Sequence, residues 1–255
     1  MLIDTHTHLY SEEFNTDRTD LITHAISLGV EKLYLPNVDS TSIDGMLALE
    51  QQFPNNCFPM MGLHPCSIKE NYKEELAIVK SWLDKRHFFA IGEIGMDLYW
   101  DKTFVKEQAF AFKQQIDWAL KFNYTMVIHC RNAFDEIFEV LQSYPKLPKG
   151  IFHCFSGTIE QAQRVLAFGN FKLGIGGVVT FKNSGLDKVV EQLTIHDLVL
   201  ETDAPYLAPN PYRGKRNESA YLPLIAEKIA EIKNISTKEV EDITTKNAEA
   251  IFANI

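Results

Sequence analysis

Short apolar segments alternate with longer amphipathic segments along the chain. The apolar segments are rich in β-branched and aromatic residues, as buried strands are, and eight of them occur, at 1–8, 32–37, 57–62, 88–93, 125–130, 150–154, 171–176 and 198–203. The segments between them, for example 74–83 and 107–122, place apolar residues at the spacing of an α-helix. The pattern therefore predicts eight strand-then-helix units.

Strands that are apolar almost throughout indicate a parallel sheet that is buried on both faces. Eight such units in 255 residues are typical of a closed (β/α)₈ TIM barrel. An open doubly wound sheet is the alternative, but DTHTH stands where its glycine-rich first turn would be. Two further helical segments follow, near 219–233 and 236–253. We expect a single α/β domain over 1–255, a TIM barrel with an extra C-terminal helix.

Five of the eight histidines lie at or just beyond the carboxyl ends of predicted strands, namely His6, His8, His64, His129 and His153. In a parallel barrel these strand ends meet at one mouth, where the active sites of this fold lie. A single histidine there is more often a structural residue, so the convergence of several carries the functional interpretation.

Alternation along the first strand predicts that His6 and His8 point the same way, with Asp4 beneath them. By the same rule Glu93 shares a face with Ile91, and Asp203 shares one with Glu201. If all these strands face inward, the carboxylates meet the imidazoles, and Asp4 and Glu201 lie one layer deeper. Carboxylates gathered without a cation repel one another and become protonated, so the pattern indicates divalent metal ions.

The candidate ligands are more than one tetrahedral ion needs: His6, His8, Glu93, His129, His153 and Asp203. Two ions that share Glu93 account for them better. A two-metal centre generates hydroxide near neutral pH and stabilises the attacking and leaving oxygens of a phosphate displacement. Imidazole-rich coordination favours Zn²⁺, Mn²⁺, Co²⁺ or Ni²⁺ over Mg²⁺, and the sequence leaves the choice among Mg²⁺, Mn²⁺ and Zn²⁺ open.

The net charge of −9 argues against a broad footprint on duplex DNA, because proteins that hold duplex phosphates are usually basic. Arg213, Lys215 and Arg216 nevertheless place positive charge in the loop after the last strand. The alternative for this loop is a solvated cap of the next helix. His64 and Arg131 are two more candidates for substrate contacts, with a simple turn and a structural ion pair as their respective alternatives.

Two groups of residues have simpler interpretations. Cys130 and Cys154 each follow a proposed ligand by one position, so alternation turns them toward the helices as small buried hydrophobes. Aromatic residues that follow strand ends could stack on nucleobases, although packing is their commoner role; they are Tyr99, Trp100, Phe155, Tyr206 and Tyr212.

No apolar segment approaches the roughly 20 residues that span a bilayer, and no signal peptide is evident. We expect a cytoplasmic protein.

The motifs, taken in order, resemble those of the TatD-family metal-dependent deoxyribonucleases of the amidohydrolase-like superfamily. They are DTHTHL (4–9), GLHP (62–65), IGEIGMD (91–97), IHCRNA (128–133), FHCFSG (152–157), and LETDAPYLAP and RGKRNE within 200–218. The resemblance implies two ion sites, one held by His6, His8, Glu93 and Asp203, the other by Glu93, His129 and His153. It also implies that Asp203 is the general base, so Asp203 and Glu93 are the predicted catalytic residues.

The predicted function is two-metal hydrolysis of DNA phosphodiesters, as a 3′-to-5′ exonuclease on single-stranded ends, with the polarity implied by the resemblance alone. The alternative is hydrolysis of amides, lactones or aminoacyl esters on the same barrel, although the basic loop favours phosphates. A structural zinc protein is a third class, but such sites mostly use four ligands that include cysteines. We expect a monomer with an oligonucleotide substrate and neither a membrane nor an obligate protein partner.

Overall fold

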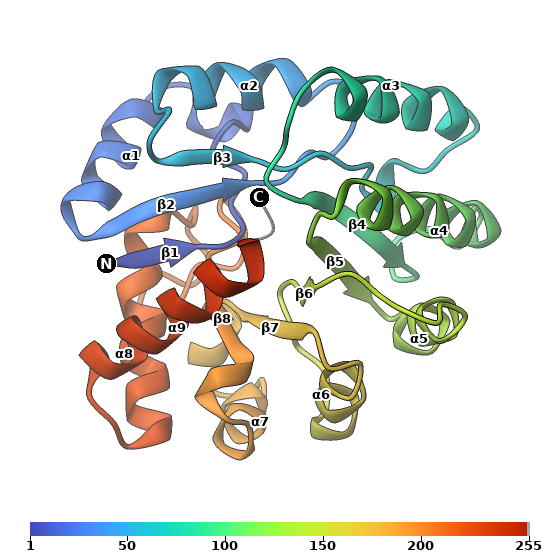
Figure 1. Cartoon of the computed structure of the whole chain (residues 1–255). Coiled ribbons are helices and arrows are strands. Elements are labelled where there is room, and N and C mark those ends of the chain that lie inside the picture. The colour runs from blue at the N-terminus through green and yellow to red at the C-terminus, as the bar shows by residue number, and fades with distance from the viewer. Residues whose placement is uncertain (254–255) are drawn as a thin grey trace.

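Parallel strands form a ring at the centre of the computed structural model, which describes residues 1–253 (Figure 1). The strands are β1 (Leu2–Asp4), β2 (Val30–Leu35), β3 (Cys57–Pro59), β4 (Ile91–Asp97), β5 (Met126–Arg131), β6 (Gly150–Phe152), β7 (Phe171–Ile175) and β8 (Leu198–Leu200). The expected domain, 1–255, extends two residues past this described part.

A helix follows each strand on the outside of the ring, and one more ends the described chain (Figure 1). The helices are α1 (Arg18–Ser27), α2 (Ile43–Gln52), α3 (Tyr72–Lys85), α4 (Val105–Phe122), α5 (Phe134–Gln142), α6 (Ile159–Leu166), α7 (Leu186–Gln192), α8 (Leu222–Lys233) and α9 (Thr237–Phe252). None of them is long and apolar enough to cross a membrane within the described residues. The predicted TIM barrel with an extra C-terminal helix is confirmed.

Continuous ladders join β1 to β3 and β4 to β8, and isolated backbone hydrogen bonds close the two gaps between these ladders. At the first gap the amide of Met61 donates to the carbonyl of Ala90, and that of Gly92 donates to Met61. At the second gap the amide of Thr5 donates to the carbonyl of Leu200. Because neighbouring strands stay parallel all the way round, their carboxyl ends share one mouth.

The interior of the barrel is filled by one inward side chain from most strands, and α9 closes its lower end. In Figure 1 this helix (red) runs toward the centre of the ring. The ring of Phe252 stacks on that of Tyr34 at 3.8 Å between centroids, and Thr125 donates its hydroxyl to the carbonyl of Ile251. Since one end is closed by α9, the functional side chains gather at the other.

Several strands end earlier than predicted, so alternation does not carry to their last predicted residues. The prediction that Asp4 lies beneath His6 and His8 is wrong, because β1 ends at Asp4. The Asp4 carboxylate turns away from the imidazoles and accepts hydrogen bonds from the hydroxyls of Thr202 and Ser219, at 2.6 and 2.7 Å. Its burial raises the pKa of Asp4 to about 7.

The prediction that Glu93 shares a face with Ile91 is also wrong, although Glu93 does reach the site. Ile91 packs in the cluster between strands and helices, and the register of β4 against β5 shifts between Ile91 and Ile94. The shift offsets the alternation by one position. Glu93 therefore points into the mouth because of an irregularity that the hydrophobic pattern does not contain.

Candidate metal centre

The six predicted ligands come together in the structure, Glu93 and His129 within β4 and β5, and the others in the segments that follow β1, β6 and β8. Most of them are buried, and Asp203 and His129 keep small exposed fractions. Beneath them, Val127 and Val199 belong to the apolar interior, so the polar group stands on a packed base. The convergence expected from the strand ends is present in the structure.

Glu93 lies at the centre of this group, and its two oxygens face different imidazoles. Oε2 lies 3.1 Å from Nε2 of His6 and 3.7 Å from Nε2 of His8. Oε1 lies 2.8 Å from Nδ1 of His129 and 3.4 Å from Nε2 of His153. One carboxylate is thereby placed between two pairs of nitrogen donors.

Asp203 adds a carboxylate to the pair formed by His6 and His8. Its Oδ1 lies 3.5 Å from Nε2 of His8 and 3.8 Å from Nε2 of His6. The residue follows β8 with a φ of +56°, and its amide donates to the carbonyl of His6 at 2.9 Å. This local turn, rather than a continued strand, aims the carboxylate at the histidines.

The hydrogen bonds of His8 determine which of its ring nitrogens faces the group. The hydroxyl of Tyr10 donates to the carbonyl of Pro36 at 2.5 Å, so it accepts from Nδ1 of His8 at 2.8 Å. A neutral His8 ring with its proton on Nδ1 turns the lone pair of Nε2 toward Asp203. Nε2 of His6 lies 3.2 Å from that nitrogen, near the roughly 3.3 Å that separates two nitrogen ligands of one tetrahedral zinc ion.

His129 is held from behind by Asp97, which is not among the residues predicted from the sequence. Nε2 of His129 lies 2.9 Å from Oδ2 of Asp97, which leaves Nδ1 directed at Glu93. Such carboxylate–histidine pairs are the usual support of a metal ligand. Asp97 stands within the quoted IGEIGMD motif, but its role depends on β4 continuing four residues past Glu93.

Glu201, which was expected one layer below Asp203, also contacts a proposed ligand from behind, namely His153. Its Oε1 lies 2.9 Å from Nδ1 of His153, an ion-pair distance at an angle outside hydrogen-bond geometry. Within the described residues, the buried side-chain atoms without a hydrogen-bond partner are Nδ1 of His6, Nδ1 of His153 and Oε2 of Glu201. The unpaired nitrogens lie on the far side of each ring from Glu93, so it is the nitrogen and oxygen donors converging on Glu93 that fit a site completed by cations.

The charges of the group also fit cations. Burial opposes ionisation of Glu93, but His64, His153 and His6 outweigh it and hold the pKa of Glu93 well below its usual range. Burial likewise opposes ionisation of Asp203, and the neighbouring imidazoles lower its pKa. Burial would lower the pKa of His153, yet Glu201, Glu93 and Asp203 raise it to about 10. Without metal ions, protons on imidazole offset the carboxylates.

The prediction that Cys154 faces the helices is wrong. β6 ends at Phe152, and Cys154 has a φ of +47°. Its Sγ lies within 4.8 Å of ligand atoms of His153 and Glu201. Cys130, by contrast, packs against the cluster between strands and helices, as predicted.

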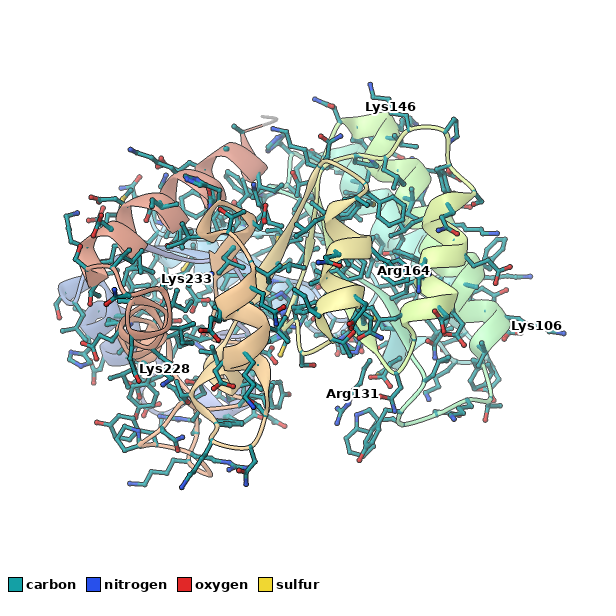
Figure 2. All side chains as sticks on the ribbon, turned by 90° about the horizontal axis from the view of Figure 1, so that it is seen from below. Lys106, Arg131, Lys146, Arg164, Lys228 and Lys233 are labelled. Carbon is teal, nitrogen blue, oxygen red and sulfur yellow. The ribbon has the colours of Figure 1, made fainter. Side chains whose placement is uncertain are left out.

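The predicted substrate contacts lie at different places. His64 belongs to the centre, with Nε2 at 3.3 Å from Oε1 of Glu93. Figure 2 shows Arg131 at the end of the molecule opposite Lys146, where the strands end. Arg213 and Lys215 are exposed in the loop after β8. Arg216 donates to both carboxylate oxygens of Asp17, at 2.5 and 3.1 Å, so an ion pair already occupies its guanidinium.

Known proteins are similar to this chain in sequence and in fold. Residues 3–253 match the family described as TatD related DNase. A metal-dependent hydrolase of Bacillus subtilis, YabD, is 36% identical over 99% of both chains. The 3′-5′ ssDNA/RNA exonuclease TatD of Erwinia tasmaniensis is 30% identical, over 98% of this chain and 99% of its own. The solved structure of YjjV, a TatD homologue of Escherichia coli, is 27% identical and superposes with a TM-score of 0.91, over 99% of this chain and 98% of its own. The chain therefore belongs to the TatD related DNase family of metal-dependent hydrolases.

Proposed function

We propose that the protein removes nucleotides from the 3′ end of single-stranded DNA, with two divalent ions held on either side of Glu93. The placement of the two Glu93 oxygens supports this most directly, because each oxygen faces its own pair of histidines. His6, His8 and Asp203 would complete one ion site, and His129 and His153 the other. The name of the Erwinia tasmaniensis relative supports the choice of nucleic acid and polarity.

The bound ions would activate water and offset the charge that develops on the phosphate. The residues of the chain accept the proton and orient the ligands. Asp203 keeps a lowered pKa and stays ionised at neutral pH, so it can accept a proton at Oδ1. Asp97 and Glu201 orient His129 and His153 from behind, which keeps the ligand nitrogens aimed at Glu93.

His64 is suited to bind phosphate rather than an ion. Its Nδ1 accepts a hydrogen bond from the amide of Cys66 at 3.0 Å, so a neutral ring carries its proton on Nε2. That nitrogen lies 3.3 Å from Oε1 of Glu93. It can donate to a phosphate oxygen, whereas a metal ion would need a lone pair at this position.

The positive side chains are proposed to hold the flanking phosphates. Arg131 follows His129 by two residues, and Arg213 and Lys215 are exposed in the loop after β8. Arg216 can join them only if its ion pair with Asp17 opens. A few such groups suit a strand end better than a long duplex, in keeping with the net charge of −9.

The test uses metal-loaded protein and single-stranded DNA labelled at its 5′ end. We expect a ladder of products shortened from the 3′ end, and none from a Glu93→Ala variant. Glu227→Ala is the matched control, because Glu227 is an exposed glutamate of α8. The same proteins are assayed with a panel of esters, lactones and amides. Intact DNA together with cleavage of a carbonyl substrate would contradict the proposal and favour the alternative hydrolase.

The monomeric state and the cytoplasmic location stay predictions. Gel filtration at several protein concentrations checks the first, and fractionation of the source cells checks the second.

A further inference from the structure

Two exposed aromatic side chains stand together beyond the end of β4. Tyr99 is 52% exposed and Trp100 is 69% exposed, and their rings meet edge to face at 4.9 Å between centroids. Apolar side chains exposed singly are common on protein surfaces, but an aromatic pair at the mouth of a barrel is a candidate contact surface.

Arg131 organises this pair from the end of β5. Its guanidinium carbon lies 4.0 Å from the centroid of the Tyr99 ring and 5.1 Å from that of Trp100. A planar guanidinium at this distance is held by stacking and by the ring quadrupole. Since Arg131 covers one face of Tyr99, the indole of Trp100 is the ring with more free surface.

Asp97 connects the aromatic pair rigidly to the metal centre. Its Oδ1 accepts hydrogen bonds from the backbone amides of Tyr99 and Trp100, at 2.9 and 3.2 Å. Its Oδ2 lies 2.9 Å from Nε2 of His129. One carboxylate thus positions a proposed metal ligand and the aromatic pair, so their separation does not depend on a free loop.

A cavity of about 600 Å³ opens beside Tyr99 and Arg131, between the ends of β5 and β6. Tyr99 and Arg131 line one part of it, and Ser156, Thr158 and Gln161 line another. Its volume lies within the range of small-molecule sites. A flat ring that reaches this cavity past Tyr99 would find polar side chains for its edge, with the carboxylates of Asp135 and Glu136 also in the lining.

We propose that Tyr99, Trp100 and Arg131 form a stacking subsite for one unpaired nucleobase of the substrate. The inference rests on the proposed nuclease function and adds a determinant of substrate choice. Every base has a π face, so the subsite accepts any base. In a duplex, both faces of a base are covered by its neighbours, so the subsite favours single-stranded or frayed ends.

The test of the stacking subsite compares two 5′-labelled single strands of DNA of equal length. One ends in thymidines and the other ends in abasic residues. Both have phosphorothioate linkages at the 3′ end, so binding can be measured on the metal-loaded protein without cleavage. The proteins are the wild type, Trp100→Ala, Trp100→Phe and Phe110→Ala. Phe110 is the matched control, an aromatic residue of α4 with a similar exposure of 51%.

We expect the wild type, Trp100→Phe and Phe110→Ala to bind the thymidine end about tenfold more tightly than the abasic end. Trp100→Ala should bind both strands with the weaker affinity, because it loses the same interaction that the abasic strand loses. A preference that persists in Trp100→Ala would overturn the subsite. A wild type without a preference would do so as well.

Hydrolysis of the same strands with ordinary linkages separates the subsite from the nuclease function. For Trp100→Ala we expect kcat/KM to fall about tenfold on the thymidine end and to stay unchanged on the abasic end. If the wild type binds with the base preference but cleaves neither strand, the nuclease proposal fails and the subsite stands. If it cleaves both equally well without a preference, the subsite fails and the nuclease proposal stands.

Discussion

Asp97 orients His129 without facing the proposed ions. Its carboxylate lies behind the ring, at 2.9 Å from Nε2, and leaves Nδ1 for coordination. Burial opposes its ionisation, but hydrogen bonds from His129 and the amide of Tyr99 hold the pKa of Asp97 below its usual range. The residue is therefore an anion at neutral pH, and it raises the basicity of the nitrogen that would bind metal.

Replacement of Asp97 by asparagine should weaken ion binding at the His129 site by about ten- to hundredfold. The amide keeps the size of the side chain but removes the charge behind His129. Metal titration monitored by calorimetry measures the effect, with Asp44→Asn as the control because Asp44 is an exposed aspartate of α2. Equal affinities of Asp97→Asn and the wild type would show that Asp97 has only a structural role.

The histidines, rather than the neighbouring cysteines, should hold the ions. Burial raises the pKa of the Cys154 thiol well above its usual range, and Asp203 and Glu201 add to the effect. A protonated thiol is a poor ligand, so Cys154→Ala and Cys130→Ala should keep both ions, whereas His129→Ala and His153→Ala should each weaken one site. Metal content after dialysis, measured by mass spectrometry, tests this. Loss of ions from Cys154→Ala would make the thiol a ligand.

The sequence predicts some residues of the metal centre better than others, and the local backbone explains the difference. Val127 and His129 lie within a regular strand, so alternation predicts the direction of His129 correctly. Asp203 and Cys154 lie beyond strand ends with positive φ angles, where alternation carries no information. The contact between Asp97 and His129 joins two neighbouring strands, and a single sequence does not contain their register.

At the scale of elements, α9 forms the base on which the centre stands. It packs beneath the barrel against β1 and β8, and it begins with a capping box in which Ser236 and Glu239 satisfy each other's amides. Ile251 and Phe252 enter the apolar interior directly below the layer of inward strand side chains. The helix thus replaces the water that would otherwise enter the barrel from this end.

Phe252→Ala should reduce the free energy of unfolding by about 3–5 kcal/mol, because the ring is buried against Tyr34 and its removal leaves a cavity. Urea denaturation of the metal-free protein measures the loss. The exposed Phe110→Ala should change stability by less than about 0.5 kcal/mol. Similar midpoints for the two variants would mean that α9 does not contribute to the packed interior.

The helices and strands were predictable in number and order, and less so in length. Alternating polarity marks where a strand packs, whereas its end depends on backbone hydrogen bonds to the neighbouring strand. β1 stops at Asp4, where its pairing with Leu33 of β2 ends. β4 runs on to Asp97 because it pairs with β5 as far as Arg131.

At the scale of the whole molecule, the fold gathers negative charge and imidazole into one small volume. Buried carboxylates lie there within ion-pair distance of the imidazoles, so the site attracts cations. In the metal-free protein those cations are protons. His153 has a pKa raised to about 10 and His129 has a raised pKa, while burial lowers the pKa of His6 to about 4.

Ion binding at pH 7 should therefore release about one proton or more, chiefly from the His153 side of the centre. Because a raised histidine pKa means that the proton is still bound at pH 7, the ion must displace it, and affinity should rise with pH up to about 10. Calorimetry in buffers of different ionisation enthalpy counts the protons. A heat of binding that is independent of the buffer would contradict the proposed competition.

Anomalous scattering from crystals of the metal-loaded protein would show whether two ions lie on either side of Glu93. We expect two peaks, one next to Oε2 with His6, His8 and Asp203, and one next to Oε1 with His129 and His153. A single peak in crystals grown with saturating metal, or ions held by Cys154 and Glu201 in place of these residues, would contradict it.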